Sequence, residues 1–522
     1  MTATESGGRS REWLWLAAAL LVALSVQLPS LQLGFVGDDY EWWLETRYRM
    51  VDNARFLEPF GGLRLTNPVM LAPDQLVWGT WTPGWHLSSL LIHGIVVGLL
   101  FGVARRVGFG PPGAAVIAAL WGASPFTVFM AREVHVRHDP LLLACWLGLA
   151  LLWPGPDDRW TWRRIAGAVT LAAVSALTKE SWVVLPGFAA AYDLAFRRSE
   201  LSSAIRTAAI WSVGPLIFVA GYLLRPAVET SYAAGYYSGG LRTAVKIPST
   251  LAAFTGLVDF DTSSRRFGPA EWVALIALFS AAVLAFRTKS AALLVGGALF
   301  LLPLIPLAPV PVMGVHYGYA SFAGFLLMVG GLAMIVVHRA EHHLARFVVA
   351  AVAYGLAAAL MVWGLSVMTG EAADATRRAQ ANHRLVAEAE DFAPNLPRDV
   401  ALVCVRLEGL VVSALLIEQV EGLPKTYFNR GSAPYGLVGW AELFSWVGEP
   451  HGGPLWREIL PEDVGSGPFS VIGHAEGRFV ELPVEDGTAA EAAARWSAKG
   501  FPVRVIRPWP GPDLRTPSAH ER

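Results

Sequence analysis

Two adjacent carboxylates, Asp38 and Asp39, directly follow the first long apolar segment of the chain. One carboxylate can accept a proton from an attacking hydroxyl, while its neighbour orients that hydroxyl or holds a cation. A low dielectric nearby raises the pKa of a carboxylate and makes it a stronger base. Acids also commonly end a membrane span, so a structural role stays open beside general-base catalysis.

A dense group of charged and imidazole side chains occupies residues 132–139 (REVHVRHD). Arg137 suits a phosphate, because the planar guanidinium can donate two parallel hydrogen bonds. His135, His138 and Asp139 have the spacing of a weak zinc signal. A solvated loop that binds no ligand is the third alternative for this segment.

The charged pair Lys179-Glu180 interrupts a nearly continuous apolar stretch, residues 165–196. Charged groups at membrane depth are costly unless they face a cavity or a partner. A local, self-neutralising pair that marks a tight outer turn would also explain the sequence. We favour a functional role, because a polar turn does not need charges.

Histidines stand at the outer ends of two apolar segments. His86 and His93 are spaced so that they share one face of a helix, about two turns apart. His86 would lie near the outer mouth, whereas a hydrogen bond to a neighbouring helix explains His93 best. His316 precedes Tyr317 and Tyr319, in a region where aromatic residues are expected as an interface belt.

The elements that would position these groups are membrane-spanning helices. Of the 522 residues, 54% are apolar and 16% are charged, whereas a soluble domain carries about 25% charged residues. The first span is expected over residues 13–36, without a clear signal-peptide cleavage site. At about 20 residues per crossing, further runs bring the count to about eleven. These runs are 86–104, 112–130, 140–154, 165–178, 181–196, 208–224, 270–286, 291–310, 319–337 and 346–368.

Basic residues assign the two sides of the membrane. Under an eleven-span count, the connections rich in Arg and Lys all fall on the side of the N-terminus, which the positive-inside rule makes cytoplasmic. The N-terminus is therefore expected in the cytoplasm and the tail outside. The expected outer loops are 38–85, 131–139, 225–269 and 311–318.

The tail, residues 371–522, changes character and predicts a small soluble domain. A buried strand is expected over 399–407, and a hairpin over 468–482 that turns at Glu476-Gly477. The tail's remaining predicted elements are helices over 376–392, 411–420 and 489–499 and a strand over 502–506.

Together these patterns predict a polytopic α-helical membrane protein with a membrane module over residues 1–370 and an extracytoplasmic α/β domain over 371–522. The formal net charge of −1 gives no global basic field that would indicate a nucleic-acid partner. Two cysteines, Cys145 and Cys404, exclude a disulfide framework and a cysteine-rich zinc site. A bridge between them is not expected, since Cys145 lies in an apolar run.

The order of the motifs resembles the integral-membrane GT-C glycosyltransferases, in particular protein O-mannosyltransferases and bacterial enzymes that transfer sugars from polyprenyl phosphates. An acidic pair follows the first span, and WHLSSLLIH opens the second. RHDPL follows over 137–141, then TKESWVVLP over 178–186, and a Tyr-containing loop precedes a late span. The resemblance covers about residues 12–340. His316 is a departure, because such enzymes often carry an Arg before these tyrosines.

The resemblance implies an inverting transfer at the outer membrane face. An acceptor hydroxyl or amine would attack the anomeric carbon of a polyprenyl-phosphate-linked sugar, with Asp38 or Asp39 as the base. Some relatives use a divalent metal and others do not, so the cofactor stays open. The implied donor-phosphate ligands are Arg137, Lys179 and His316. The implied supporting residues are His86, His138, Asp139, Glu180 and Tyr317.

Two other classes of protein fit the sequence less well. A transporter or flippase with an outer sensor domain would carry ionisable groups near the bilayer midplane and often an internal repeat, whereas here the charges cluster at one face. An O-antigen polymerase or ligase would not need an acidic pair after the first span. The expected location is the bacterial cytoplasmic membrane, and the acceptor, a protein, a glycan or a lipid, stays open.

Overall fold

The structure is a computed structural model of residues 1–522, and it falls into two compact units. The first unit comprises Met1–Ser30, Glu58–Asn67 and His86–Gly370, and the second comprises Leu31–Leu57, Pro68–Trp85 and Glu371–Arg522. The residues that the structure describes are 3–33, 66–79, 81–223, 246–255, 268–306, 318–339, most of 347–370, 401–405, 455–459, 468–475, 478–482, 487–499 and 503–509, with Asp39, Thr46, Ala373 and Val464 as single positions.

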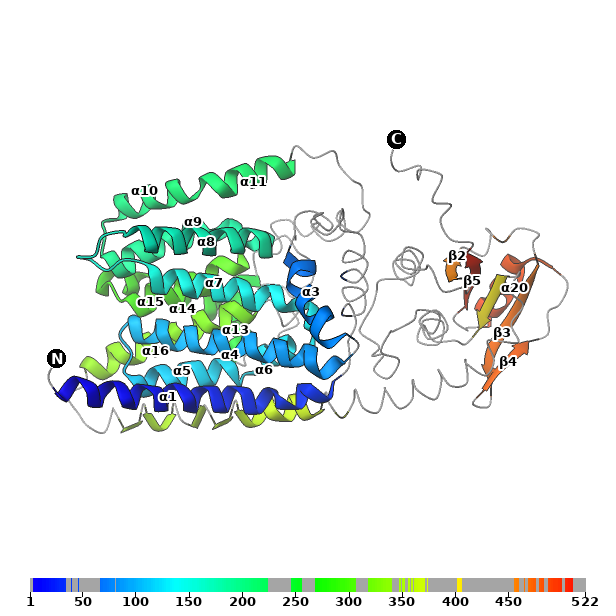
Figure 1. The fold of residues 1–522 in the computed structure, drawn as a ribbon, viewed down its shortest axis with the longest axis horizontal. Coiled ribbons are helices and arrows are strands. Elements are labelled where there is room, and N and C mark those ends of the chain that lie inside the picture. The colour runs from blue at the N-terminus through cyan, green and yellow to red at the C-terminus, as the bar shows by residue number, and fades with distance from the viewer. Residues whose placement is uncertain are drawn as a thin grey trace. The chain divides into compact units, whose positions relative to one another are not determined.

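The first unit is a bundle of apolar helices that lie side by side (Figure 1). Helix α1 packs on α5, α7 on α8, and α15 on α16. The bundle contains a free, buried cysteine, Cys145. The helices are α1 (Ala3–Gln27), α4 (Thr82–Arg106), α5 (Pro111–Gly122), α6 (Pro125–Arg132), α7 (His138–Leu152), α8 (Trp162–Thr178), α9 (Leu185–Tyr192), α10 (Leu201–Trp211), α11 (Val213–Leu223), α13 (Lys246–Phe254), α14 (Pro269–Thr288), α15 (Ala291–Leu301) and α16 (Gly318–Arg339).

Several helices are long and apolar enough to cross a membrane. Among the described residues there are 4 of them, or up to 5 if the bent pair α5 and α6 is one span. The four are Glu12–Gln32, Thr82–Arg106, Pro269–Thr288 and Gly318–Val337. Other predicted spans coincide with helices that are shorter than a full crossing, so the count of eleven stays a prediction.

The predicted span 112–130 is a bent pair of helices in the structure. Helix α5 ends at Gly122, α6 begins at Pro125, and the two are bent by 57°. Proline cannot donate a backbone hydrogen bond, and it disfavours helical geometry at the residue before it. The Gly122 carbonyl accepts hydrogen bonds from Gln27 Nε2 at 3.2 Å and from Thr127 Oγ1 at 3.1 Å. The protein therefore satisfies the opened backbone internally, as a non-aqueous surrounding requires.

A second interruption confirms the predicted break between spans 165–178 and 181–196. Helix α8 ends at Thr178, Lys179 is extended, and a 3-10 turn over Glu180–Val184 leads into α9. Pro186 stands in the first turn of α9, where a missing N–H costs nothing. The break leaves Lys179 at a point where the backbone changes direction.

Close packing of α15 on α16 depends on small residues. A Cβ atom on Gly296 would lie 2.8 Å from the backbone nitrogen of Met328 and 2.9 Å from the carbonyl oxygen of Gly324. Such contacts are too short for any side chain, so glycine permits the two backbones to approach. These glycines thereby permit the short helix α15 to pack closely against the longer helix α16.

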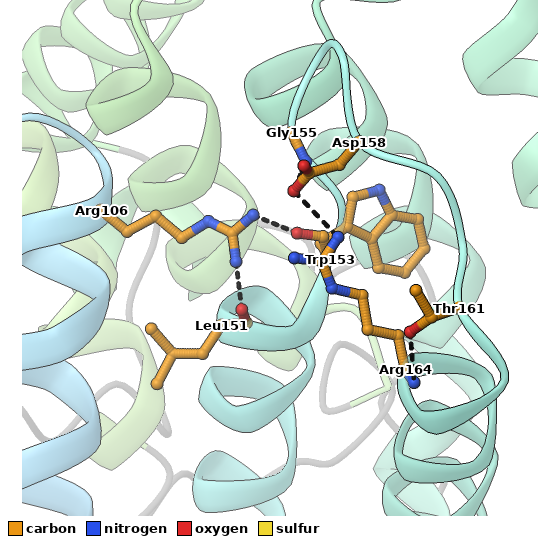
Figure 2. Close-up of polar contacts among 7 residues, drawn as sticks. All are labelled: Arg106, Leu151, Trp153, Gly155, Asp158, Thr161 and Arg164. Atoms are coloured by element: carbon orange, nitrogen blue, oxygen red, sulfur yellow. Dashed lines mark hydrogen bonds and ion pairs between the residues drawn. The ribbon is translucent and has the colours of Figure 1, made fainter.

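Arg106 joins the end of α4 to the end of α7 (Figure 2). Its guanidinium donates to the carbonyl oxygens of Leu151 and Trp153, which α7 leaves without helical partners. Its Cζ also lies 4.3 Å from the centre of the Phe196 ring. In the following loop, a hydrogen bond from Arg164 lowers the pKa of Asp158 below its ordinary value.

Replacing Arg106 by Lys is expected to destabilise the bundle by about 2 kcal/mol. Lysine keeps the charge, but it lacks the planar guanidinium that donates hydrogen bonds to both carbonyl oxygens. Denaturant unfolding of the full chain in detergent would measure the loss. Arg163→Lys is the matched control, since Arg163 is exposed and lies 5.6 Å from the Trp162 ring. Equal stability of the two variants would contradict the proposed role of the Arg106 guanidinium.

The second unit contains a mixed five-stranded sheet of order β2-β5-β1-β3-β4. Strands β3 and β4 pair antiparallel with Ala475 opposite Arg478, which confirms the two predicted strands of the hairpin. The predicted turn residues, Glu476 and Gly477, lie outside the described residues. Strand β2 was not predicted, and the predicted helices 376–392 and 411–420 lie outside the described residues. The strands are β1 (Ala401–Val405), β2 (Leu455–Ile459), β3 (Phe469–Ala475), β4 (Arg478–Leu482) and β5 (Val503–Trp509).

Helix α20 (Ala489–Ala498) contributes the buried core beside this sheet. Its residues Ala489, Ala492 and Ala493 cluster with Val471 and Val505 of β3 and β5. Thr488 and the carboxylate of residue 491 form a reciprocal capping box at its start. The backbone N–H of Thr488 donates to that carboxylate and lowers the pKa of the Glu491 side chain. The division at residue 371 itself stays a prediction.

Candidate functional site

Lys179 and Asp139 form a short ion pair inside the first unit. Lys179 Nζ lies 2.6 Å from Asp139 Oδ1, and the two side chains are 4% and 15% exposed. Lys179 comes from the break after α8, and Asp139 from the first turn of α7. A carboxylate is stabilised at a helix N-terminus, so Asp139 suits this position. The fold thus brings one predicted phosphate ligand and one predicted supporting residue together.

Arg137 lies two residues before Asp139 and is almost completely buried. Its side chain is 2% exposed, and its Nε donates a hydrogen bond of 2.8 Å to Ser89 Oγ of α4. A buried guanidinium requires partners, because an unpaired charge away from water costs several kcal/mol. We call the three charged residues Arg137, Asp139 and Lys179 the cation cluster, since Arg137 and Asp139 are two residues apart in the chain and Lys179 pairs with Asp139.

His138 lies at the edge of the cation cluster. Its Nε2 is 3.4 Å from Asp139 Oδ2, and its Nδ1 is 3.1 Å from the carbonyl oxygen of His135. His135 in turn lies 3.8 Å from a carboxylate oxygen of Glu133. No three His, Cys, Asp or Glu side chains come together as metal ligands within the part of the chain that the structure describes. The zinc alternative thus gains no support from these residues.

One face of α4 carries polar side chains toward the rest of the bundle. His86 and His93 are both buried, and both hydrogen-bond to other helices. His86 Nδ1 lies 2.9 Å from the carbonyl oxygen of Ala131 in α6. His93 Nε2 lies 3.1 Å from the Gly122 carbonyl oxygen. The contact of His93 with Gly122 confirms the structural explanation of His93. The contact of His86 with Ala131 likewise joins two helices.

The acidic pair is described only in part. Asp39 is helical and 3% exposed, whereas Asp38 lies outside the described residues. His316 and Tyr317 also lie outside them, and for Glu180 only the backbone is described. The roles of these residues stay predictions.

Ser89 was not singled out from the sequence, and Tyr319 was expected only as part of an aromatic belt. Ser89 contacts Arg137, and the hydroxyl of Tyr319 in α16 lies 3.2 Å from His93 Nδ1. Because His93 Nε2 faces a carbonyl oxygen, Nε2 carries the proton and Nδ1 accepts from Tyr319. The sequence signal that could have identified Ser89 is its spacing from His86 and His93, which places all three on one face of a helix.

Comparisons with known proteins give a match among solved structures. No protein-family model matches the chain, and no curated protein matches it. The crystal structure of ArnT from Cupriavidus metallidurans bound to undecaprenyl phosphate is 15% identical with a TM-score of 0.47, covering 90% of this chain and 97% of that chain. The apo structure of the same protein is 16% identical with a TM-score of 0.45, over the same shares of both chains.

Proposed function

We propose that the protein is a glycosyltransferase that moves a sugar from a polyprenyl-phosphate donor to an acceptor at the extracytoplasmic membrane face, with inversion. The observation that supports this most is the cation cluster. It contains two buried basic side chains: Arg137 donates a hydrogen bond to Ser89 of α4, and Lys179 pairs with Asp139, which stands two residues after Arg137 in the chain. Such an arrangement suits an anionic group on a lipid that enters from the bilayer.

The cation cluster has the chemistry that a departing lipid phosphate needs. When the sugar–oxygen bond breaks, negative charge develops on the phosphate, and fixed cations in a water-poor site stabilise it. Asp139 pairs with Lys179 at 2.6 Å. A donor phosphate would share or replace that carboxylate as the partner of the ammonium group. His316, His138 and Tyr317 are further proposed contacts around the phosphate.

Asp38 or Asp39 is the proposed general base. A carboxylate near the apolar region is a stronger base than one in water, because burial disfavours its charged form. The burial of Asp39, at 3% exposed, agrees with a role inside the protein. The acceptor would give its proton to the carboxylate as its oxygen or nitrogen bonds to the anomeric carbon, while the lipid phosphate leaves.

Membrane extracts that contain the protein test the proposal. Offered a polyprenyl-phosphate donor with a labelled sugar, they are expected to transfer the label, and Arg137→Gln is expected to abolish the transfer. Arg163→Gln, at an exposed site, is the control that should transfer normally. Movement of the lipid across the bilayer without transfer would instead indicate a transporter, and elongation of a lipid-linked glycan would indicate a polymerase. Either result would reject the proposed function.

We also propose that the N-terminus is cytoplasmic and that the domain over 371–522 lies outside the bacterial cytoplasmic membrane. The bias of Arg and Lys among the loops supports this orientation. A reporter enzyme that works only outside the cytoplasm should be active when fused after Arg522. Activity of a cytoplasm-only reporter at the same position would overturn the orientation and the odd number of spans.

A further inference from the structure

Three buried polar residues line one face of α4 and connect it to the surrounding elements. His86, Ser89 and His93 follow the spacing i, i+3, i+7, which places them on one side of a helix. His86 contacts α6, and His93 contacts the end of α5 and the hydroxyl of Tyr319. Ser89, between them, contacts the side chain of Arg137. The two histidines therefore fix α4, and Ser89 presents a hydroxyl to the cation cluster from that fixed helix.

The hydrogen bond from Arg137 Nε to Ser89 Oγ controls how the guanidinium is oriented. Arginine binds a phosphate best when two N–H groups lie in the plane of two phosphate oxygens. A bond at Nε restricts rotation of that plane, and its length of 2.8 Å is a normal, well-formed contact. Both partners are nearly inaccessible to water, at 5% for Ser89 and 2% for Arg137. Water is therefore a poor substitute for the hydroxyl.

We propose that Ser89 is a positioning residue for the donor phosphate, acting through the orientation of Arg137. The inference rests on the proposed function, because Arg137 is the proposed phosphate ligand. Ser89 itself does not contact the reacting atoms in this proposal. Its effect should therefore fall on donor binding and, because Arg137 also stabilises the leaving phosphate, on the rate of the chemical step.

Binding of undecaprenyl phosphate to the full chain in nanodiscs tests the proposal. Ser89→Ala is expected to weaken binding about 10-fold, the effect of losing one hydrogen bond to a charged group. Ser89→Thr keeps the hydroxyl and should bind nearly as the natural protein does. Ser25→Ala is the control, because the Ser25 hydroxyl is exposed and bonds within α1, to the carbonyl oxygen of Val22 at 2.9 Å. With a sugar-bearing donor, KM should rise and kcat should fall in Ser89→Ala, since a misaligned Arg137 both binds the donor less well and stabilises the leaving phosphate less well.

The outcomes separate this inference from the proposed function. If the natural protein does not bind the lipid phosphate, both are overturned. Binding by the natural protein that is unchanged in Ser89→Ala overturns the positioning role alone. Equal weakening by Ser89→Ala and Ser89→Thr, or a fall in kcat without a rise in KM, also overturns it. If Ser89→Ala does not fold, Ser89→Cys, which keeps a similar volume with a much weaker acceptor, takes its place in the same measurement.

Discussion

Replacing Asp38 by Asn is expected to reduce sugar transfer by about 10²–10⁴-fold, the contribution typical of a general base. Asparagine keeps the size of the side chain and its capacity for hydrogen bonds, but it cannot accept the acceptor's proton. Binding of the lipid donor and expression should stay nearly normal. Initial rates with a labelled polyprenyl-phosphate sugar would measure the effect.

Neighbouring carboxylates should respond differently from Asp38. Asp39→Asn is expected to have a smaller effect, because the base is assigned to Asp38 and its neighbour to an orienting role. Asp157→Asn is the control, since Asp157 is exposed in the connection between α7 and α8. Near-normal transfer by the Asp38→Asn, Asp39→Asn double variant would exclude base catalysis by this pair.

Removing one partner of the buried ion pair should have the largest effect on stability. Lys179→Met is expected to destabilise the protein by about 3–5 kcal/mol, because it leaves Asp139 as a buried carboxylate without its ammonium partner. The double variant Lys179→Met, Asp139→Leu should recover most of that loss, since both charges of the pair are then removed. Denaturant unfolding in detergent would measure both, and donor binding should be lost in both.

An exposed ion pair of the same protein provides the control. Arg164 and Asp158 lie 2.9 Å apart with side chains 35% and 52% exposed, so Arg164→Met should cost only about 0–1 kcal/mol. If Lys179→Met were no more destabilising than Arg164→Met, Lys179 would not depend on its buried partner. If the double variant were as unstable as the single one, the loss would come from packing instead of from an uncompensated charge.

The sequence determined the class of protein and several local features. The chain has too few charged residues to form the polar surface of a soluble domain, and its apolar runs are long enough to span a membrane, so a helical membrane module follows from composition. The interruption at Lys179 and the hairpin of β3 and β4 were also predicted, because each has a signal within a few residues of sequence. For Lys179 the signal is a pair of charges inside an apolar run, and for the hairpin it is a turn sequence between two alternating segments. The bend before Pro125 was missed, although proline is a local signal, because the apolar pattern continues across it.

Only the tertiary structure decided which charged groups meet. The sequence suggested Glu180 as the neighbour that could neutralise Lys179, whereas the structure pairs Lys179 with Asp139, 40 residues away. Ser89 likewise meets Arg137 across 48 residues. Periodicity shows which residues share a face of one helix, but it does not show which face of another helix lies opposite. That choice depends on how α4, α7 and α8 pack, and packing is a property of the whole bundle.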